Sequence, residues 1–398
     1  MEPPRLTRAL IAGAGIAGLT LAMALAKQGV EVVVFERAAK LEAFGAGLQL
    51  SPNATRALAR LGLLEGIAPR ACAPGRVRVL RGRDDTQLSS LDLTGAQSRW
   101  GAPYLTIHRA DLAAALAQAC AAERKIEIRP GHELVGYGAD SDKVRVTVKR
   151  GLVSLSEDGD LLIGADGLRS KVREKLVADP ADAPAFAGRI AFRATLPAQG
   201  LRADEGAPVV TLRLGRRAHL VQYALRGGAI INLVAVIEAG WRGAAPANPW
   251  DGEADRPALE QAFAGWSRNA RALIAAPAVW RAWPLYVRPP LPTYASGRVA
   301  LAGDAAHPMV PFLAQGAAQA IEDADAFASA LAREADVASA LAAYSAARVA
   351  RTTRVQREAL AQARVYHMSG PLAFARDLGM RALGPEGLMR RYDWLYGA

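Results

Sequence analysis

Three glycine-marked segments, far apart in the chain, restrict its possible folds more than any other feature. They are residues 13–18 (GAGIAG), 164–167 (GADG) and 303–308 (GDAAHP). A lone GxGxxG arises by chance in a chain rich in alanine and glycine. Here, however, each segment directly follows a short apolar run that predicts a buried strand. Three such segments in this order predict parts of one nucleotide site in an α/β protein.

The first segment lies between a predicted strand and a predicted helix. The order of elements is strand, glycines, apolar helix and second strand, over residues 8–11, 13–18, 19–26 and 30–35. Gly13 permits the tight turn, Gly15 lets a pyrophosphate approach the backbone, and Gly18 lets helix and strand pack closely. Glu36 closes the second strand, where a carboxylate can accept hydrogen bonds from ribose hydroxyls, and Arg37 follows it directly.

The same region has a competing interpretation as a secretory signal. Residues 9–26 form an uncharged run preceded by two arginines, as in the apolar part of a signal peptide. A signal peptide has no use for glycines at this spacing, nor for a buried strand and an acid directly afterwards. Because no other run is long enough to span a membrane, we predict a cytoplasmic protein with no membrane partner.

The formal net charge of +11 invites a nucleic-acid interpretation. Four arginines of a predicted helix over residues 344–366 recur every three positions: Arg348, Arg351, Arg354 and Arg357. At 100° per residue this spacing spreads them over half the helix circumference, and no aromatic residue is interleaved for base stacking. We therefore expect a solvated arginine-rich face and no nucleic-acid partner.

Length and strand pattern predict two or three structural units. Residues 76–100 contain a predicted strand pair. Four strands then follow without intervening helices, over residues 189–196, 209–214, 218–225 and 229–237, which favours an antiparallel sheet. We predict an α/β chain with a Rossmann-type domain, an inserted antiparallel-sheet substrate domain and a C-terminal helical segment. The expected ranges are 1–75, 101–180 and 286–345 for the first, 76–100 and 181–285 for the second, and 346–398 for the third.

The two cysteines, Cys72 and Cys120, have neither CxxC nor metal-ligand spacing. Two isolated thiols fit a reducing compartment and are expected to be inert packing residues. We predict no metal site.

The second and third motifs each place a carboxylate at the end of a predicted strand. Asp166 and Gly167 follow residues 161–163, and Asp304 follows residues 298–302. Open α/β sheets bind ligands at this end of their strands. For the second motif, a plain strand-turn-helix with Asp166 as a turn former is an equally good interpretation.

A helix with small first residues is predicted to follow the third motif. It begins around Gly316 and Ala317, after two prolines that include Pro311. The small residues would let a flat ring system lie close. Backbone donors at such a helix start can stabilise negative charge on the ring.

Together these segments, with residues 303–318 reading GDAAHPMVPFLAQGAA, resemble the single-component flavoprotein aromatic hydroxylases. This family includes salicylate, 6-hydroxynicotinate and 3-hydroxybenzoate monooxygenases. The similarity covers nearly the whole chain and is weakest over residues 76–100 and 238–280. It implies a p-hydroxybenzoate hydroxylase-like fold, FAD as cofactor, and NADH or NADPH as co-substrate. It further implies a monomer or homodimer in which oxygen passes from a flavin C4a-hydroperoxide to a small phenolic or hydroxylated heteroaromatic acid.

The resemblance also implies which residues hold the cofactor. Four would hold the ADP half of FAD: Gly13, Gly15, Gly18 and Glu36. Arg109 would contact the cofactor, and Asp304 would bind the ribityl chain. Two would serve the pyrophosphate and the encounter with NAD(P)H: Asp166 and Gly167. Two would lie at the flavin N1 and C2 carbonyl: Gly316 and Ala317.

Oxygen transfer is faster to a phenolate than to a phenol, so the implied reaction needs a proton acceptor near the substrate hydroxyl. His219 and Tyr223 are the candidates, because positions 219, 221 and 223 point to one face of a predicted strand. Hydroxynicotinate and hydroxybenzoate relatives look similar here, with a His and a Tyr at this spacing. From the residues alone, two ordinary sheet residues with satisfied hydrogen bonds would be the alternative.

Two positions depart from some members of the family. Gln49, a candidate substrate contact, stands where some relatives place a histidine, and Pro311 stands where some hydroxybenzoate enzymes carry a polar side chain. In this family a proline at position 311 would lie against the flavin near its reactive edge. The WxWxIP pattern of flavin halogenases is absent. The competing hypothesis is an NAD-dependent Rossmann dehydrogenase without oxygen chemistry, which rests on the first motif alone.

Overall fold

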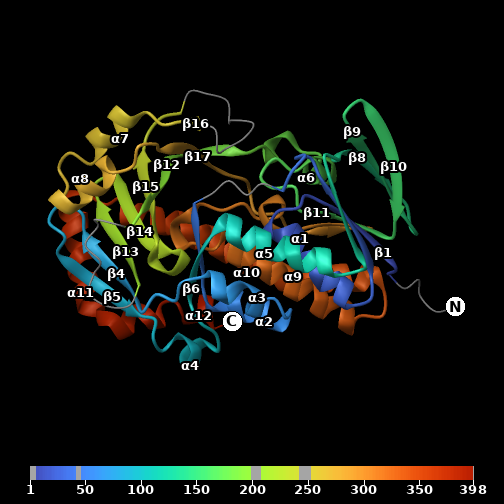
Figure 1. The fold of residues 1–398 in the computed structure, drawn as a ribbon, viewed down its shortest axis with the longest axis horizontal. Helices are drawn as coiled ribbons and strands as arrows, with labels where there is room; N and C mark the ends of the chain where they lie inside the picture. The colour runs from blue at the N-terminus through green and yellow to red at the C-terminus, as the bar shows by residue number, and fades with distance from the viewer. Residues whose placement is uncertain (1–5, 42–45, 199–207, 242–251, 398) are drawn as a thin grey trace.

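The protein is elongated, with two large sheets side by side along its length (Figure 1). This is a computed structural model, and it describes residues 6–41, 46–198, 208–241 and 252–397. The six-stranded sheet lies on the right in Figure 1 and the eight-stranded sheet on the left, with long helices running between them. The fold is the mixed α/β arrangement that the strand pattern predicts.

The six-stranded sheet has the order β18-β19-β11-β1-β2-β7. Its strands are β1 (Arg8–Ala12), β2 (Glu31–Glu36), β7 (Ile126–Pro130), β11 (Leu161–Gly164), β18 (Ala295–Ser296) and β19 (Val299–Leu301). All pairs are parallel except β18 with β19. Strands β19, β11 and β1 are direct neighbours, so their carboxyl ends bring the three glycine motifs side by side.

Helices α1 (Ile16–Lys27), α5 (Arg109–Ala122) and α9 (Gly316–Arg333) pack together beside the six-stranded sheet. The uncharged run of residues 9–26 is therefore β1, the first glycine turn and most of α1. Its burial inside the α/β core explains its apolar character without a secretory role. Among the residues that the structure describes, no helix combines the length and the apolarity needed to cross a bilayer.

The eight-stranded sheet has the order β16-β17-β12-β15-β14-β13-β4-β5. Its strands are β4 (Arg76–Arg81), β5 (Gln87–Asp92), β12 (Ala185–Pro197), β13 (Val209–Gly215), β14 (Ala218–Leu225), β15 (Ile230–Glu238), β16 (Gly252–Glu253) and β17 (Arg281–Val287). Pairing is antiparallel as predicted, with one correction: β4 and β13 pair in parallel. The pairing attaches the segment of residues 76–100 to the later strands, because it places β4 directly beside β13.

The two faces of the eight-stranded sheet are covered differently. Helices α7 (Arg256–Ala262) and α8 (Arg268–Ala275) pack on the face that carries Leu220 and Leu233. The opposite face, which carries Val221 and Val236, packs against Phe312 and the end of α10 (Val337–Tyr366). Residues 219, 221 and 223 share this second face, which is turned towards the segment leading into α9.

Smaller elements complete the described fold. The additional strands are β3 (Gly47–Leu50) paired with β6 (Leu105–His108), and the sheet β8 (Glu133–Ala139), β9 (Val144–Arg150) and β10 (Val153–Gly159). The additional helices are α2 (Pro52–Arg60), α3 (Leu64–Ile67), α4 (Ala96–Trp100), α6 (Lys171–Val177), α11 (Gly370–Arg390) and α12 (Asp393–Tyr396). The expected boundary between residues 345 and 346 falls inside α10, which packs against α9 and also against the eight-stranded sheet.

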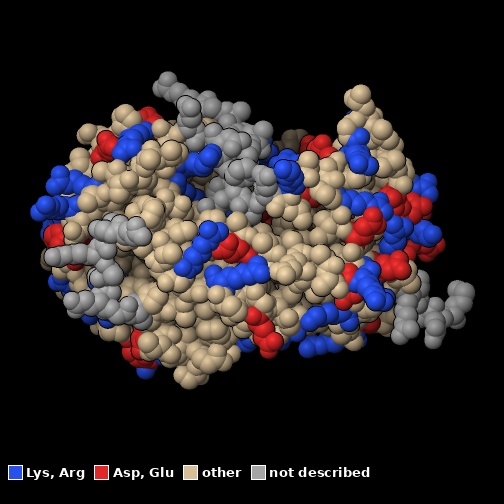
Figure 2. Space-filling view, in the orientation of Figure 1, with Lys and Arg blue, Asp and Glu red and all other residues tan. Residues whose placement is uncertain are grey.

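Charged side chains of both signs are mixed over the face drawn in Figure 2. Basic side chains lie next to acidic ones there and do not form one continuous basic surface. Ion pairs such as Arg145 with Asp158 and Arg129 with Glu127 likewise place charges of both signs side by side.

Candidate active site

The glycine motifs contact one another where β1, β11 and β19 end. Gly13 has φ of +99°, and a Cβ there would lie 2.5 Å from the carbonyl oxygen of Ala165 in the second motif. A Cβ at Gly18 would collide with the carbonyl oxygen of Gly13. Gly303 has φ of +58°, and a Cβ there would lie 2.7 Å from the Cβ of Ala17. The packing of the protein itself therefore requires these three glycines.

Gly15 differs from its neighbours in the motif. A Cβ at Gly15 would have no atom within 4 Å, and the same holds at Gly316 at the start of α9. Protein packing thus gives no reason for glycine at either position. Open space beside both residues fits the close approach of a ligand to the backbone.

Two helices begin beside these open glycines. Gly15 is the N-cap of α1 and Gln315 is the N-cap of α9, and neither helix start has a side-chain cap. By contrast, His108 caps α5 and Ser170 caps α6. Uncapped N–H groups at a helix start are suited to bind phosphate or another anionic group.

Glu36 is held beside the first motif at the end of β2. Its carboxylate accepts hydrogen bonds from the backbone N–H of Ala14 (2.9 Å) and of Ala38 (2.8 Å). The carboxylate is thus fixed at the sheet edge where a ribose is expected. Its neighbour Arg37 is exposed.

One carboxylate oxygen of Asp166 stabilises the turn into α6, and the other has no hydrogen-bond partner. Its Oδ2 accepts from the backbone N–H groups of Lys171 (2.8 Å) and Val172 (3.3 Å) at the start of α6. Its Oδ1 is buried and has no hydrogen-bond partner. Burial raises the pKa of this carboxyl. The turn-former interpretation is therefore correct for one oxygen, while the other fits a ligand group, since buried polar atoms are rarely left unpaired.

Asp304 of the third motif and Arg109 at the start of α5 are close enough for each to affect the pKa of the other. Asp304 is solvent-accessible. Even so, the surrounding protein desolvates it and raises its pKa, opposed by Arg109 and His307. Burial lowers the pKa of Arg109, opposed by Asp304. An acid and a base that influence each other at the carboxyl ends of the strands can bind a ligand that has both hydroxyl and anionic groups. The open glycines and the unpaired oxygen of Asp166 lie at the same end of the sheet, and groups of these kinds are suited to a dinucleotide.

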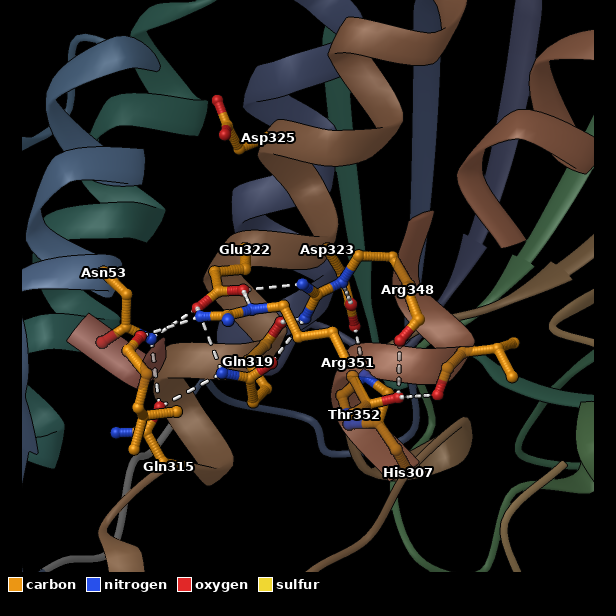
Figure 3. Close-up of polar contacts among 12 residues, drawn as sticks. Asn53, His307, Gln315, Gln319, Glu322, Asp323, Asp325, Arg348, Arg351 and Thr352 are labelled. Carbon is orange, nitrogen blue, oxygen red and sulfur yellow. Dashed lines mark hydrogen bonds and ion pairs between the residues drawn. The ribbon is translucent and has the colours of Figure 1, made fainter. Parts of the chain in front are cut away.

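A buried polar network holds the third motif in place (Figure 3). Asp323 of α9 accepts from the backbone N–H of Gly303 and contacts Nε2 of His307, both at 2.7 Å. Arg348 of α10 pairs with Asp323 at 2.7 Å and with Glu322 at 2.6 Å. Both helices therefore fix the loop that carries Asp304.

This network corrects the expected solvated arginine face. Arg348 is buried and Arg351 pairs with Glu322 at 2.6 Å, whereas Arg354 and Arg357 are exposed. The expectation fails for a physical reason. Charge and spacing show in which direction an arginine side chain can point, but they do not show that a neighbouring helix places buried carboxylates beside it.

Tyr223 of β14, on the eight-stranded sheet, lies near Gln49 of β3. Gln49 accepts a hydrogen bond from the hydroxyl of Tyr104 at 2.6 Å. The ring of Tyr223 packs on Gly47, where a Cβ would lie 2.5 Å from Cε2. Burial raises the pKa of Tyr223, and Arg193 and Gln49 oppose this. Tyr223 is thus a neutral phenol held in a polar cluster.

His219 lies on the same face of β14, nearer the segment that precedes α9. Its ring centroid is 5.2 Å from that of Phe312, which follows Pro311. Its Nδ1 lies 2.9 Å from Nε2 of His367. Burial lowers the pKa of His219 well below the usual range, with further contributions from His367 and Arg189. Four positions along a strand separate His219 from Tyr223 by about 13 Å, with Val221 between them on the same face.

The FAD binding domain model matches residues 6–359 of this chain. The chain belongs to the FAD binding domain family. It is 37% identical over 394 residues to 3-hydroxybenzoate 6-hydroxylase 1 of Aquipseudomonas alcaligenes, with 98% of this chain and 97% of that protein covered. It is 32% identical over 358 residues to 6-hydroxynicotinate 3-monooxygenase of Bordetella bronchiseptica, with 88% and 90% covered. A solved salicylate hydroxylase substrate complex matches with a TM-score of 0.82 and 27% identity, covering 99% of this chain and 96% of that one.

These findings confirm the predicted fold class and the predicted family. This member of the FAD binding domain family is a flavin-dependent monooxygenase of aromatic compounds. They do not support the dehydrogenase hypothesis, because the family match includes all three glycine motifs and the strands of the eight-stranded sheet as well as the first motif.

The sequence reasoning missed several residues that the structure brings to the site. His307 stood inside a quoted motif without a role, and Asp323 lay in a predicted helix. His367 and Glu238 had no motif at all. Among these residues, only His307 could have been found from the sequence. It follows closely after the carboxylate at the end of a predicted strand, where open α/β sheets bind ligands.

Proposed function

We propose that this flavoprotein hydroxylates a small aromatic acid that already carries a ring hydroxyl group, with NADH or NADPH as reductant and O2 as oxygen source. One observation carries the proposal. In a chain similar over its whole length to a 3-hydroxybenzoate hydroxylase, His219 and Tyr223 lie on one face of β14, with His219 beside Phe312 of the segment that leads into α9 and Tyr223 against Gly47.

The proposed FAD contacts lie where β1, β11, β19 and β2 end and where α1 and α9 begin. The ADP half would lie on the first motif and the end of β2: Gly13, Gly15, Gly18, Glu36 and Arg37. The pyrophosphate and the ribityl chain would lie between the other motifs and α5: Arg109, Asp166, Gly167 and Asp304. The ring would lie at the start of α9: Pro311, Gly316 and Ala317. When bound, FAD would take up the reducing equivalents of NADH or NADPH and supply the site of oxygen activation.

The two residues of β14 are proposed to have different roles. A neutral histidine has a ring nitrogen that can accept the proton of the substrate hydroxyl, and burial keeps His219 neutral near pH 7. Tyr223 has a raised pKa and therefore remains a hydrogen-bond donor that orients the substrate, together with Gln49. Ionising the substrate hydroxyl makes its ring electron-rich and prepares it for oxygen transfer.

The domain ranges and the cellular setting also remain proposals. The strands of the two large sheets favour a division close to residues 76–100 and 181–285 for the substrate domain. The two cysteines are free and buried, which favours a reducing compartment such as the cytoplasm. We propose a monomer or a homodimer.

A substrate panel tests the proposed function. The purified protein, loaded with FAD, is mixed with NADH or NADPH and with hydroxybenzoates, aminohydroxybenzoates and hydroxynicotinates in turn. We expect at least one compound to stimulate NAD(P)H oxidation and to yield a hydroxylated product in step with oxygen uptake. Peroxide is measured in parallel to separate hydroxylation from uncoupled oxidation. No product from any compound, with FAD bound, would contradict the proposal.

A further inference from the structure

His219 begins a line of hydrogen bonds that continues through two more side chains, away from the sheet face. Nδ1 of His219 lies 2.9 Å from Nε2 of His367, the residue that ends α10. Nδ1 of His367 lies 3.1 Å from Oε1 of Glu238 at the end of β15. The histidine side chains are almost fully buried, whereas that of Glu238 is 26% exposed. The line therefore runs from the candidate substrate face to solvent.

The hydrogen bonds determine which nitrogen of each ring carries the proton. A carboxylate only accepts, so Nδ1 of His367 carries a hydrogen and donates to Glu238. Its Nε2 must then accept, which requires Nδ1 of His219 to be the donor. This leaves Nε2 of His219 as an unprotonated acceptor, the form that a base towards a substrate hydroxyl needs.

We propose that His219, His367 and Glu238 form a proton relay that carries the proton of the substrate hydroxyl to solvent. The substrate O–H bond breaks as Nε2–H of His219 forms. Nδ1–H of His219 breaks as Nε2–H of His367 forms, and Nδ1–H of His367 breaks as the proton reaches Glu238, which releases it to water. No electrons leave or enter the chain of groups. His367 and Glu238 are positioning residues that act through His219, and their role rests on the proposed function.

The groups around the relay favour this direction. Arg189 of β12 and Arg217 pair with Glu238 at 2.9 and 3.2 Å. Burial alone would raise the pKa of Glu238, but His367 and these arginines bring it below the usual range, so the acid releases its proton readily to water. Arg189 also disfavours the charged form of both histidines. Another titratable neighbour is Tyr366, whose ring centroid is 5.3 Å from that of His219 and whose pKa burial raises well above the usual range, so it stays neutral.

The first test measures the tautomers directly, without turnover. In FAD-loaded protein labelled with 15N-histidine, the ring nitrogens of His219 and His367 are assigned with the variants His219→Gln and His367→Gln. We expect Nδ1–H on both rings at pH 7. Nε2–H on either ring would overturn the relay. This result is independent of whether any panel compound is hydroxylated.

The second test uses His367→Gln, which can accept a hydrogen bond from His219 but cannot pass a proton. With 3-hydroxybenzoate as the probe, we expect FAD content and KM close to wild type, and a kcat at pH 7 lower by about 10- to 100-fold. The pH at which the bound phenol ionises, followed by its ultraviolet difference spectrum, should rise. An unchanged kcat and ionisation profile in a variant that retains FAD would overturn the relay.

A second variant guards against misfolding of the first. Glu238→Gln keeps a side chain of the same size at a partly exposed position and should shift the kcat profile in the same direction, with KM unchanged. Its matched control is Glu260→Gln on α7, where the glutamate makes a surface pair with Arg256. A Glu238→Gln profile that matches that of Glu260→Gln would count against the relay. Wild-type protein that neither binds nor hydroxylates any compound of the panel would instead contradict the proposed function.

Discussion

Arg348 and Asp323 form an ion pair of 2.7 Å in which both side chains are almost completely shielded from solvent. Burial alone would raise the pKa of Asp323, but His307 and Arg348 bring it below the usual range. The same carboxylate accepts from the backbone of Gly303. The pair therefore couples α10 to the loop that carries Asp304, and it keeps that loop in one conformation before any ligand binds.

Arg348→Met should destabilise the protein strongly, because the buried carboxylate of Asp323 loses its arginine and that of Glu322 keeps only Arg351. We expect a loss of about 3–5 kcal/mol in the free energy of unfolding, the usual cost of removing one member of a buried pair. Arg357→Met on the same helix removes an exposed arginine and should change stability by no more than about 0.5 kcal/mol. Urea unfolding of the FAD-loaded proteins measures both, and equal losses would contradict the structural role of Arg348.

Gly15 and Gly18 should respond differently to substitution. Gly15→Val adds a side chain in open space, so the flavin-free protein should keep its thermal stability while its affinity for FAD falls about tenfold or more. Gly18→Ala forces a Cβ into the carbonyl of Gly13 and should lower stability itself. Thermal unfolding of flavin-free protein and a fluorescence titration with FAD separate the two effects. Wild-type FAD affinity in Gly15→Val would exclude this turn as the cofactor site.

Asp304→Asn should weaken FAD retention without unfolding the protein. A hydrogen bond to a charged group contributes about 1.5–3 kcal/mol, so the dissociation constant for FAD should rise about 10- to 100-fold. Asp325→Asn is the control, since Asp325 of α9 forms an ion pair with Arg60 at the surface. A fully yellow, active Asp304→Asn protein would contradict the role proposed for this carboxylate.

Tyr223→Phe should keep FAD but lose part of its hydroxylation. The variant removes the phenol hydroxyl near Gln49, and the ring can still pack on Gly47. We expect slower product formation, or diversion of NAD(P)H oxidation towards peroxide, because the substrate is oriented less well. Product and peroxide are quantified with the best compound of the panel. An unchanged product yield would remove Tyr223 from the mechanism.

Stability should fall on mild acidification because of the buried histidines. Burial lowers the pKa of His367 from 6.5 to about 4, opposed by Glu238. At a pH between these two values, His367 is protonated in the unfolded chain and neutral in the folded protein. The free energy of unfolding is therefore at its full value above pH 6.5 and falls as the pH drops from 6.5 towards 4. The difference corresponds to about 3 kcal/mol. Urea unfolding at a series of pH values, with saturating FAD, should show the free energy of unfolding falling as the pH falls. This dependence on pH should be weaker in His367→Gln.

The cofactor half of the protein could be predicted from sequence because its determinants are local. Gly13, Gly18 and Glu36 lie within one strand-helix-strand unit, whose turn chemistry and strand pattern are written in consecutive residues. Likewise, the alternation along β14 places positions 219, 221 and 223 on one face, because strand geometry has a period of two.

Tertiary structure alone decided the contacts between distant segments. The parallel pairing of β4 with β13, the burial of Arg348 beside Asp323, and the meeting of His219 with His367 each join residues more than 20 positions apart. No local period or motif encodes such a pairing, because it depends on which faces of separate elements pack together. The sequence by itself thus determined the α/β flavoprotein fold and its three glycine motifs. Only the packing of α10 against both sheets determined which charges are buried and which distant side chains meet.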